Sequence, residues 1–134
     1  MARRDDLGAV LEVWRKADAE PSVTDDLDTL RRLLDHAQWS LLVAELEGEI
    51  VGTLIAAWDG WRGNLYRLAV VPAHRGRGIG LDLVRQGEIE LRGRGAARLA
   101  AVVVEDHGHA TGFWEAAGYE RQSLRLRFVK NCAS

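Results

Sequence analysis

Apolar residues near the start of the chain recur at the spacing of an α-helix. Four of them follow two aspartates and fall every three or four positions: Leu7, Val10, Leu11 and Trp14. An aspartate just before such a run can accept hydrogen bonds from the first free amides of a helix. A second set with the same spacing begins after Thr24 and two more aspartates: Leu27, Leu30 and Leu34. The pattern therefore predicts two amphipathic helices, separated by a break at residues 20–23.

The next segments carry strand patterns. Three runs rich in apolar and β-branched residues are separated by short polar segments that contain glycine: Ser40–Leu46, Ile50–Trp58 and Leu65–Val71. The Glu47–Gly48 dipeptide predicts a tight turn, so the first two runs are expected to form a hairpin. Residues 59–64 indicate a loop before the third run.

The second half of the chain alternates helical and strand patterns. A helix is expected from Gly78 to about Arg92, a buried strand over Arg98–Val104, and a short helix over Thr111–Ala117. Apolar side chains alternate with charged ones over residues 124–128, which predicts a half-buried last strand. Helices and strands that alternate in this way favour an α/β fold. Because neither a repeat nor a linker composition is found, we expect one domain over residues 1–134.

Composition and charge exclude several classes of partner. The 134 residues carry a net charge of −2, so no excess of basic residues favours nucleic acid or an anionic membrane. No apolar run approaches the roughly 20 residues that span a bilayer, and no signal peptide is recognisable before the first helix. The single cysteine, Cys132, cannot form an internal disulfide. We therefore expect a cytoplasmic protein without nucleic-acid or membrane partners.

A glycine-rich segment joins the third predicted strand to the following helix. Three glycines, Gly76, Gly78 and Gly80, alternate with Arg75, Arg77 and Ile79. Glycine lets a ligand approach the main chain closely, and amides that lead into a helix N-terminus attract anions. The segment therefore predicts a site for a phosphate or a pyrophosphate.

Three phosphate-binding patterns compete for this segment. A P-loop requires Gly-Lys-Ser/Thr, but Ile79 and Gly80 follow Gly78, which excludes it. A dinucleotide fingerprint requires a third glycine where Leu81 stands, so it is poorly met. The third pattern, Arg/Gln-x-x-Gly-x-Gly, is met by Arg75, Gly78 and Gly80.

This last pattern belongs to a series of four features in a fixed order. They are the strand before the loop, the loop itself, the helix with the strand after it, and the segment His107-x-x-Ala110-x-x-Phe113-Trp114-Glu115-x-x-Gly118-Tyr119. In this order they resemble the GNAT superfamily of N-acetyltransferases. The resemblance runs from about Leu41 to Phe128.

The resemblance implies a mixed β-sheet flanked by helices in a single domain. In the family the sheet splays apart between its fourth and fifth strands, which correspond here to Leu65–Val71 and Arg98–Val104. A first strand is expected before the first helix, but only residues 1–4 precede Asp5, so this strand is short or missing. The edge of Ser40–Leu46 would then be exposed, which makes a homodimer through this edge a hypothesis.

The resemblance also implies acetyl-CoA as co-substrate, bound in the splayed opening. Its pantetheine arm would pair with the backbone of Leu68, Ala69 and Val70 as another strand would. Its phosphates would lie on the loop, with further contacts from two residues near the C-terminus: Arg75, Gly76, Arg77, Gly78, Ile79 and Gly80, then His107 and Phe113. Tyr66, Leu68 and Val70 fall on one face of the strand, and a β-bulge is expected where Val71 interrupts the alternation.

Acetylation of an amine requires a donor for the oxyanion, a base for the amine and a proton for the thiolate. The resemblance assigns the first role to the Val70 amide. Trp114 stands where the family often has a tyrosine as the acid, and an indole N–H cannot act as an acid near neutral pH. Tyr119 is the next phenol, but its position favours packing in the core. The base stays open among four carboxylates: Glu105 and, alternatively, Glu45, Asp59 or Asp106.

The acceptor is the least determined part of the site. Tryptophans beside an acid, Trp58, Asp59 and Trp61, can hold a cationic amine through cation–π and ionic contacts. A small-molecule amine or a peptide N-terminus fits such contacts, and no residue pattern predicts a metal. Two functions therefore stand. One is an N-acetyltransferase that transfers acetyl directly in a ternary complex. The alternative, favoured by Trp114, is an acyl-CoA-binding sensor or partner subunit with little turnover.

Overall fold

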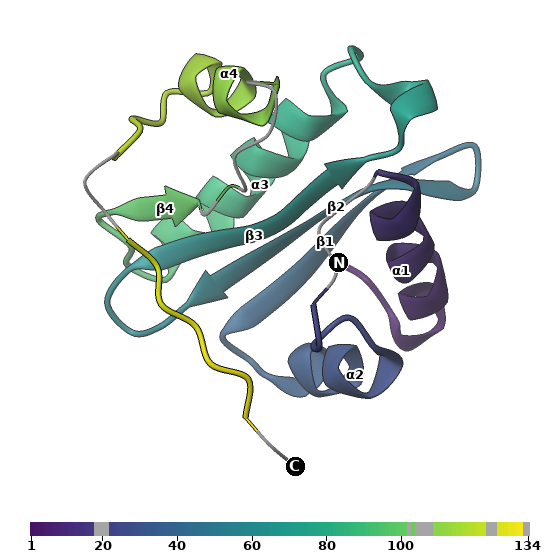
Figure 1. Cartoon of the computed structure of the whole chain (residues 1–134), viewed down its shortest axis with the longest axis horizontal. Coiled ribbons are helices and arrows are strands. Elements are labelled where there is room, and N and C mark those ends of the chain that lie inside the picture. The colour runs from purple at the N-terminus through teal and green to yellow at the C-terminus, as the bar shows by residue number, and fades with distance from the viewer. Residues whose placement is uncertain (18–21, 102, 104–108, 123–125, 133–134) are drawn as a thin grey trace. The chain divides into compact units, whose positions relative to one another are not determined.

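A computed structural model gives the structure of residues 1–17, 22–101, 103, 109–122 and 126–132 (Figure 1). The chain divides into two compact units, Met1–Val102 and Val103–Ser134. The first unit contains the β-sheet, and the second contains a short helix and the C-terminal segment. A single domain over the whole chain stays a prediction.

Two helices open the first unit, as the apolar spacing predicts. Helix α1 covers Leu7–Lys16 after a 3-10 turn, η1 (Arg4–Asp6), and α2 covers Leu27–Asp35. Asp26 caps α2, because its Oδ1 accepts a hydrogen bond from the Thr29 amide at 2.7 Å. The buried side chains of α1 are Leu7, Val10, Val13 and Trp14. The amphipathic stripe that the sequence predicts for α1 is therefore confirmed.

Four strands form one mixed sheet in the order β1–β2–β3–β4. They are β1 (Trp39–Leu46), β2 (Glu49–Trp58), β3 (Gly63–Val70) and β4 (Leu99–Ala101). Strand β2 runs antiparallel to both β1 and β3, whereas β3 and β4 are parallel. The α/β class and the mixed sheet are therefore confirmed.

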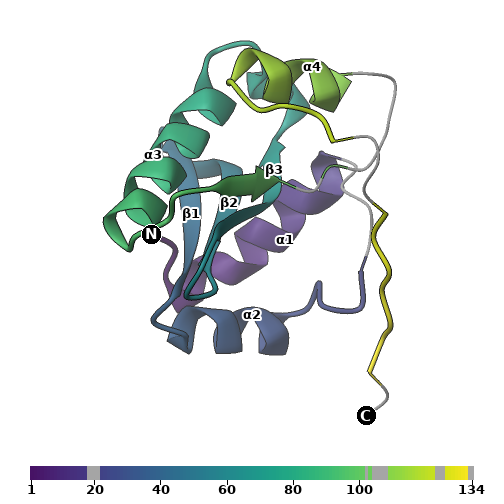
Figure 2. The ribbon, with the colours of Figure 1, turned by 90° about the vertical axis from the view of Figure 1, so that its left-hand side faces the viewer.

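Helices cover both faces of this sheet. Helices α1 and α2 lie on one face, and α3 (Ile79–Gly93) lies on the other (Figures 1 and 2). The middle strand β2 is consequently buried on both sides. Its Val51 and Ile55 belong to the core under α1, whereas Leu54 packs on Gly87 of α3. Burial on both faces explains why much of β2 is a continuous apolar run rather than a strict alternation.

The pairing between β3 and β4 is short. Its register comprises three pairs and ends at Leu65 opposite Ala101. Strand β3 itself continues to Val70 and stays paired with β2, where Gly52 lies opposite Val70. Residue 102, which follows the last pair, lies outside the described residues. The splay that the resemblance implies would open beyond this pair.

The predicted short first strand is reduced to one backbone contact. The Ala2 amide donates to the Leu41 carbonyl at 2.8 Å, and Ala2 is buried. A cavity of about 350 Å³ lies beside it, between β1 and the first turns of α3, and Met1, Ala44 and Ile79 form part of its lining. Ala2 thus covers one end of the β1 edge. Pairing of the rest of this edge with a second copy stays a prediction.

The second unit contains helix α4 (His109–Ala116), which lies close to the predicted helix. The chain leaves α4 through Gly118, whose φ of 99° is left-handed. The predicted last strand is wrong for the described part of the tail, because residues 126–132 form no strand and Leu126 and Phe128 are 83% and 90% exposed. Alternation supplies two faces but no hydrogen-bond partner, and the described residues of this unit include no strand beside which the tail could pair. Residue 124 lies outside the described ranges.

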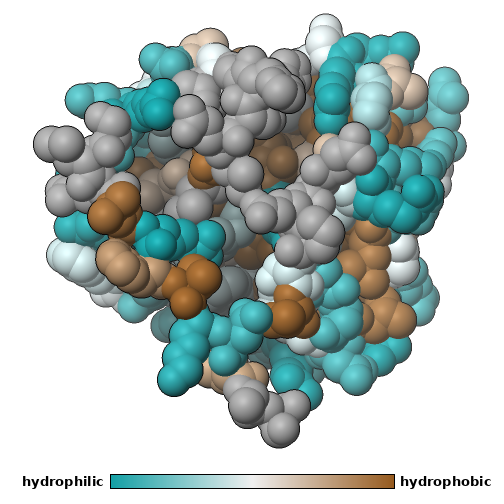
Figure 3. Space-filling model, in the orientation of Figure 1, coloured by the Kyte–Doolittle hydropathy of each residue, from teal (hydrophilic) through white to brown (hydrophobic). Residues whose placement is uncertain are grey.

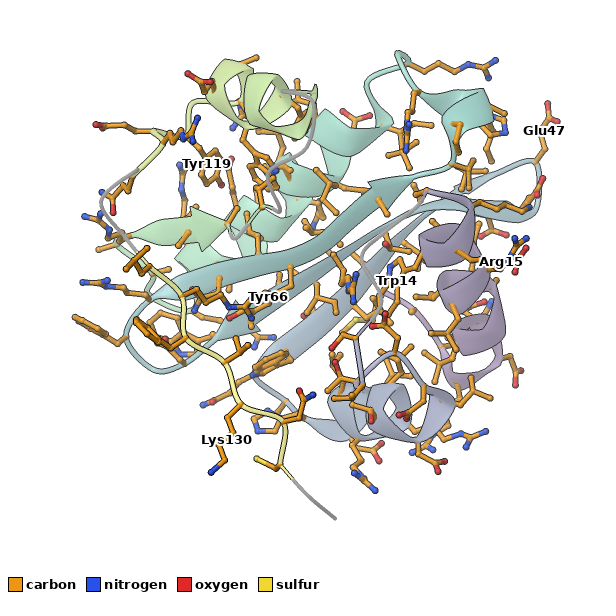
Figure 4. All side chains as sticks on the ribbon, viewed as in Figure 1. Trp14, Arg15, Glu47, Tyr66, Tyr119 and Lys130 are labelled. Atoms are coloured by element: carbon orange, nitrogen blue, oxygen red, sulfur yellow. The ribbon has the colours of Figure 1, made fainter. Side chains whose placement is uncertain are left out.

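The outward side of the first two helices is polar. Figure 4 shows Trp14 pointing from α1 toward the sheet, whereas its neighbour Arg15 points away. Hydrophilic residues with small apolar patches between them form the surface over α1 and α2 (Figure 3). Among the described residues, none of the helices combines the length and apolar character that crossing a membrane requires.

Candidate functional site

The glycine loop leads from the end of β3 to the start of α3. A 3-10 turn, η2 (Pro72–His74), comes first, and two left-handed glycines follow, Gly76 with φ of 80° and Gly78 with φ of 82°. Gly78 is the N-cap residue of α3, so the cap supplies no side chain to the first helical amides. A Cβ placed on either glycine would meet no atom within 4 Å. The loop backbone therefore borders open space in which a phosphate can approach it.

Arginine side chains fix this loop to the rest of the unit. Arg75 Nε donates to the Val70 carbonyl at 3.1 Å, and one of its terminal nitrogens lies 3.5 Å from the Ala17 carbonyl. Arg77 lies 3.5 Å from His74 Nδ1. Both guanidinium groups are exposed and add positive charge to that of the α3 N-terminus. The loop thus offers the geometry and the potential that a pyrophosphate requires.

The backbone direction at the end of β3 follows from one hydrogen bond. The Val71 amide donates to the Val51 carbonyl of β2 at 2.9 Å. Because successive residues of a strand point their amides to opposite edges, the Val70 amide points away from β2. It therefore points to the edge of β3 that pairs with β4 up to Leu65. The edge opposite β2 is also the one to which the resemblance assigns the oxyanion donor and the pantetheine arm.

A β-bulge interrupts β3 three residues before its end. Thr53 lies opposite Ala69 and Ile55 opposite Tyr66, so Arg67 and Leu68 together oppose one residue of β2. Arg67 takes a left-handed conformation, with φ of 54°. The extra residue bends the strand locally and changes which side chains share a face.

The bulge corrects two expectations. It lies at Arg67 and Leu68, not at Val71, which is buried in the core under α1. Tyr66 packs against that same core and therefore shares a face with Ala69 and Val71 rather than with Leu68. The cause is the additional residue in the bulge, because it reverses the faces to which all later side chains of the strand point. Figure 4 shows Tyr66 on the face of β3 that also carries α1.

Four side chains form a polar cluster beneath this bulge, here called the bulge cluster: Trp14, Asp25, Thr53 and Arg67. Trp14 Nε1 donates to Thr53 Oγ1 at 2.8 Å, and that hydroxyl donates to the Arg67 carbonyl at 2.9 Å. An Arg67 terminal nitrogen lies 2.8 Å from each Asp25 carboxylate oxygen, and the Arg67 guanidinium carbon lies 5.0 Å from the centre of the Trp14 ring. No local pattern in the sequence predicts this cluster. Its signal in the sequence is a threonine and an arginine near the middle of largely apolar strands.

The loop between β2 and β3 holds two of the predicted acceptor residues. Asp59 Oδ1 accepts from the amides of Trp61 at 2.8 Å and Arg62 at 2.7 Å. The backbone amides of Arg62 and Trp61 hold the pKa of the Asp59 carboxyl below its ordinary value, which makes it a weaker base. Trp61 is 70% exposed, and the Arg62 guanidinium carbon lies 3.9 Å from its ring centre.

The structure separates this loop from the glycine loop. The two loops flank opposite ends of β3, about 25 Å apart for a strand of this length. Trp58 lies at the end of β2, where its ring comes within 3.9 Å of a Cβ position on Gly95. Glu45, the alternative base, is exposed on β1, two strands away from β3. The structure therefore brings neither Asp59 nor Glu45 to the Val70 amide.

The remaining candidates lie in the C-terminal unit. The Trp114 ring meets the rings of Phe113 and Tyr119 edge to face, at centroid distances of 5.4 Å and 5.0 Å. The contact supports the packing role expected for Tyr119. Glu105, Asp106 and His107 lie outside the described residues. Within the described ranges, no three His, Cys, Asp or Glu side chains are grouped so that they could hold a metal ion.

Known proteins share both the sequence and the fold. The acetyltransferase (GNAT) family model matches residues 8–119. An acetyltransferase of Pectobacterium atrosepticum is 38% identical over 118 residues, which cover 88% of this chain and 84% of that protein. The aminoglycoside antibiotic 6'-N-acetyltransferase AAC(6')-IG from Acinetobacter haemolyticus, solved in the apo state, is 22% identical with a TM-score of 0.81 and covers 98% of this chain and 97% of its own. The PaiA N-acetyltransferase from Thermoplasma acidophilum, solved with coenzyme A, is 16% identical with a TM-score of 0.81, over 92% and 89% of the two chains.

These matches agree with the geometry of the first unit. The two structural relatives share its fold, one of them with coenzyme A bound, and the family match includes β3, the glycine loop and α3. The left-handed glycines and the open β3 edge fit the phosphates and the arm of such a cofactor. The chain belongs to the GNAT family of acetyltransferases and is an enzyme that uses acetyl-CoA as its co-substrate.

Proposed function

We propose that the acceptor is a primary amine and that acetyl passes to it directly within a ternary complex. The observation that supports this proposal is the direction of the Val70 amide, which points to the edge of β3 opposite β2, beyond the last described pair with β4. The amine nitrogen attacks the thioester carbonyl carbon, a C–N bond forms, and the C–S bond breaks to release a thiolate. The amine gives up one proton and the thiolate takes up one proton, so the transfer is balanced. Cys132 lies exposed in the tail, which supports direct transfer over an acyl-cysteine intermediate.

Each role in this reaction has a proposed residue. The glycine loop from Arg75 to Gly80 binds the phosphates, the edge of β3 pairs with the pantetheine arm, and the Val70 amide stabilises the oxyanion. Glu105 is the proposed base for the amine. Trp114, which stands where the family often has a tyrosine acid, donates no proton, because an indole is not acidic near neutral pH. Solvent then protonates the thiolate, which is a good leaving group.

The position of the loops gives the acceptor a direction of approach. The phosphates lie at the C-terminal end of β3, so the arm runs toward the bulge and the acceptor must arrive from the other end. Asp59 and Trp61 flank that end. The exposed Trp61 face and the neighbouring carboxylate favour a cationic acceptor that is long enough to reach from this loop to the bulge. Aminoglycosides belong in the first screen, since one structural relative is named for them.

The test combines ligand binding with turnover. Thermal unfolding is followed with acetyl-CoA and with a nicotinamide dinucleotide as the control ligand. A ligand at one hundred times its Kd adds about 2.7 kcal/mol to stability, which corresponds to a shift of several degrees in a domain of this size. Thiol release from acetyl-CoA is then measured against a panel of amines. A thermal shift without thiol release for any amine would favour the binding-module alternative, and no shift at all would contradict the proposed site.

A glycine pair supplies the matched variants for this test. Gly78→Ala places a Cβ on a residue with φ of 82°, whereas Gly8→Ala changes an α1 glycine without such a constraint; both face open space. We expect Gly78→Ala to reduce the acetyl-CoA-dependent shift strongly, because the strained loop can no longer present its amides. Gly8→Ala should keep the full shift. Equal shifts in the two variants would contradict the role of the loop.

A further inference from the structure

The residue that forms the β3 bulge is not the type its conformation favours. Arg67 has a φ of 54°, a region that disfavours side chains with a Cβ. A glycine would adopt it without strain. The left-handed conformation therefore raises the free energy of the folded state at Arg67, directly before the Leu68–Val70 edge. The contacts of the Arg67 side chain must offset this increase.

The contacts of Arg67 hold both its backbone and its side chain. The Arg67 carbonyl accepts from Thr53 Oγ1, which is fully buried and accepts in turn from the Trp14 indole. The guanidinium group lies over the Trp14 ring and pairs with both oxygens of Asp25. The bond from the Thr53 hydroxyl holds the Arg67 carbonyl in the direction that it takes in the bulge. The cluster thus selects the bulged register over a continuous ladder.

Asp25 extends this cluster to the connection between α1 and α2. Its amide donates to the Ser22 carbonyl at 3.0 Å, and its Oδ2 accepts from the Ser22 amide at 3.1 Å. The next residue, Asp26, caps α2. The Asp25 and Arg67 side chains are each 20% exposed, so water screens their attraction less than that of the surface pairs. The ion pair therefore joins a rigid turn, 42 residues away in sequence, to the bulge.

We propose that Arg67 is a positioning residue for acetyl transfer and that Asp25 acts through it. This inference rests on the proposed function, because it concerns the placement of the Val70 amide. The bulge cluster holds Arg67 in its left-handed conformation, and three residues later the chain delivers the Val70 amide to the open edge. Loss of the ion pair lets the bulge relax toward an extended strand, which moves the Val70 amide away from the developing oxyanion. Neither charged side chain needs to touch the thioester.

Three variants test the contributions of the Asp25 charge and of the Arg67 side chain separately. Asp25→Asn removes the charge but keeps an acceptor oxygen and the size of the side chain. Arg67→Lys keeps a cation without the planar fork, and Arg67→Gly removes the side chain but permits the left-handed backbone. We expect Asp25→Asn and Arg67→Gly to lower kcat about ten- to one hundred-fold, the loss typical of a small misplacement. The KM for acetyl-CoA should stay within about two-fold, and Arg67→Lys should recover part of kcat.

A second ion pair provides the matched control. Arg85 and Glu88 of α3 lie 2.8 Å apart, and the Glu88 side chain is 8% exposed. Arg85→Gln removes the charge partner of Glu88, whose side chain is more buried than that of Asp25 or Arg67. This pair belongs to α3, on the other face of the sheet. The substitution should lower the thermal midpoint while kcat stays at the wild-type value. A drop in kcat equal to that of Asp25→Asn would overturn the proposal, since general loss of stability would then explain both.

Amide signals in a ¹⁵N–¹H correlation spectrum give a readout that does not need turnover. We expect Asp25→Asn and Arg67→Lys to move the Leu68 and Val70 signals, and Arg85→Gln to leave them in place. Unmoved signals, or a wild-type kcat in Asp25→Asn, would overturn the positioning role. If acetyl-CoA does not raise the thermal midpoint of the wild-type protein, the proposed function is contradicted. The spectra would still show whether the ion pair holds the bulge. If Arg67→Gly does not fold, Asp25→Asn and Arg67→Lys carry the decision.

Discussion

On the face of the sheet covered by α3, small residues bring the helix close to the strands, whereas the face under α1 and α2 buries hydrogen bonds and an ion pair. A Cβ on Gly87 would lie 2.9 Å from Leu54, and a Cβ on Gly63 would lie 2.7 Å from Leu99. The opposite face contains the bulge cluster, with Thr53 fully buried. The first face depends on apolar packing without space for an added methyl group, and the second on directional contacts.

The two kinds of contact suit what each face positions. Close packing sets the distance of α3 from the sheet, and with it the position of the glycine loop at the start of that helix. Packing alone is tolerant of small shifts along a strand, however, because apolar contacts have little direction. The hydrogen bond from Thr53 to the Arg67 carbonyl specifies one register, which is what a bulge beside the proposed oxyanion donor needs. We infer that the α3 face mainly supports cofactor binding and that the α1 face mainly supports turnover.

The largest effect is expected from overpacking the α3 face. Gly87→Val introduces atoms where a Cβ alone already comes within 2.9 Å of Leu54 and 3.2 Å of Leu65. We expect a loss of about 3 kcal/mol in the free energy of unfolding, at the upper end of the usual cost of overpacking. Urea unfolding measures this loss, and titration of the folded protein should show weaker acetyl-CoA binding because α3 is displaced.

Gly93→Val is the control for this change. Gly93 is the last residue of the same helix, and a Cβ there meets no atom within 4 Å. Its substitution should leave the free energy of unfolding within about 0.5 kcal/mol of the wild-type value. Comparable losses at Gly87 and Gly93 would mean that helix propensity, not packing against the strands, explains the result.

A smaller loss of stability but a clearer loss of turnover is expected on the α1 face. Thr53→Val keeps the shape of the side chain but removes the hydroxyl that bonds the Trp14 indole and the Arg67 carbonyl. The buried Trp14 indole N–H and the part-buried Arg67 carbonyl then lose this partner, which we expect to cost about 2 kcal/mol. Steady-state kinetics should show a lower kcat at nearly constant KM for acetyl-CoA. Weaker acetyl-CoA binding at normal kcat would contradict the division of roles between the faces.

The same difference explains what could be predicted from sequence. The helices and strands of the first unit follow from local spacing, and the glycine loop follows from Gly76, Gly78 and the strand before them. These features depend on neighbours in the chain. The contacts that hold the bulge come from Asp25, 42 residues before Arg67, and from Thr53 on the neighbouring strand. Because these residues are distant in sequence, no local pattern predicts the bulge. Sequence spacing therefore predicted the position of the glycine loop better than that of the bulge in β3.

The tail illustrates the same limit. Residues 124–128 alternate apolar and charged side chains, which predicts a strand, yet Leu126 and Phe128 are exposed. A strand exists only where another backbone offers hydrogen bonds, and alternation carries no information on that partner. Asp59 is a related case, because its carboxylate was a candidate base and instead bonds two amides of its own turn.

The smallest expected effect concerns the starts of the two helices that lie on opposite faces. Helix α2 is capped by the Asp26 carboxylate, whereas α3 begins at Gly78 without a capping side chain. The Thr29 amide, as the main cause, holds the pKa of Asp26 below its ordinary value of 3.8. A carboxyl with a lowered pKa stabilises the fold above that ordinary value, and the contribution is lost as the pH falls through the folded-state pKa. Acid should therefore weaken α2 at its cap, whereas the cap residue of α3, Gly78, has no side chain that could titrate.

Asp26→Asn isolates this contribution, because an amide oxygen caps a helix about as well as a carboxylate but does not titrate. Urea unfolding of both proteins should give a constant difference in free energy between pH 7 and about pH 5, where Asp26 is ionised in both the folded and the unfolded chain. Below an ordinary pKa of 3.8 the wild type should lose stability relative to the variant. A difference that stays constant down to pH 3 would show that the Asp26 charge adds nothing to the cap.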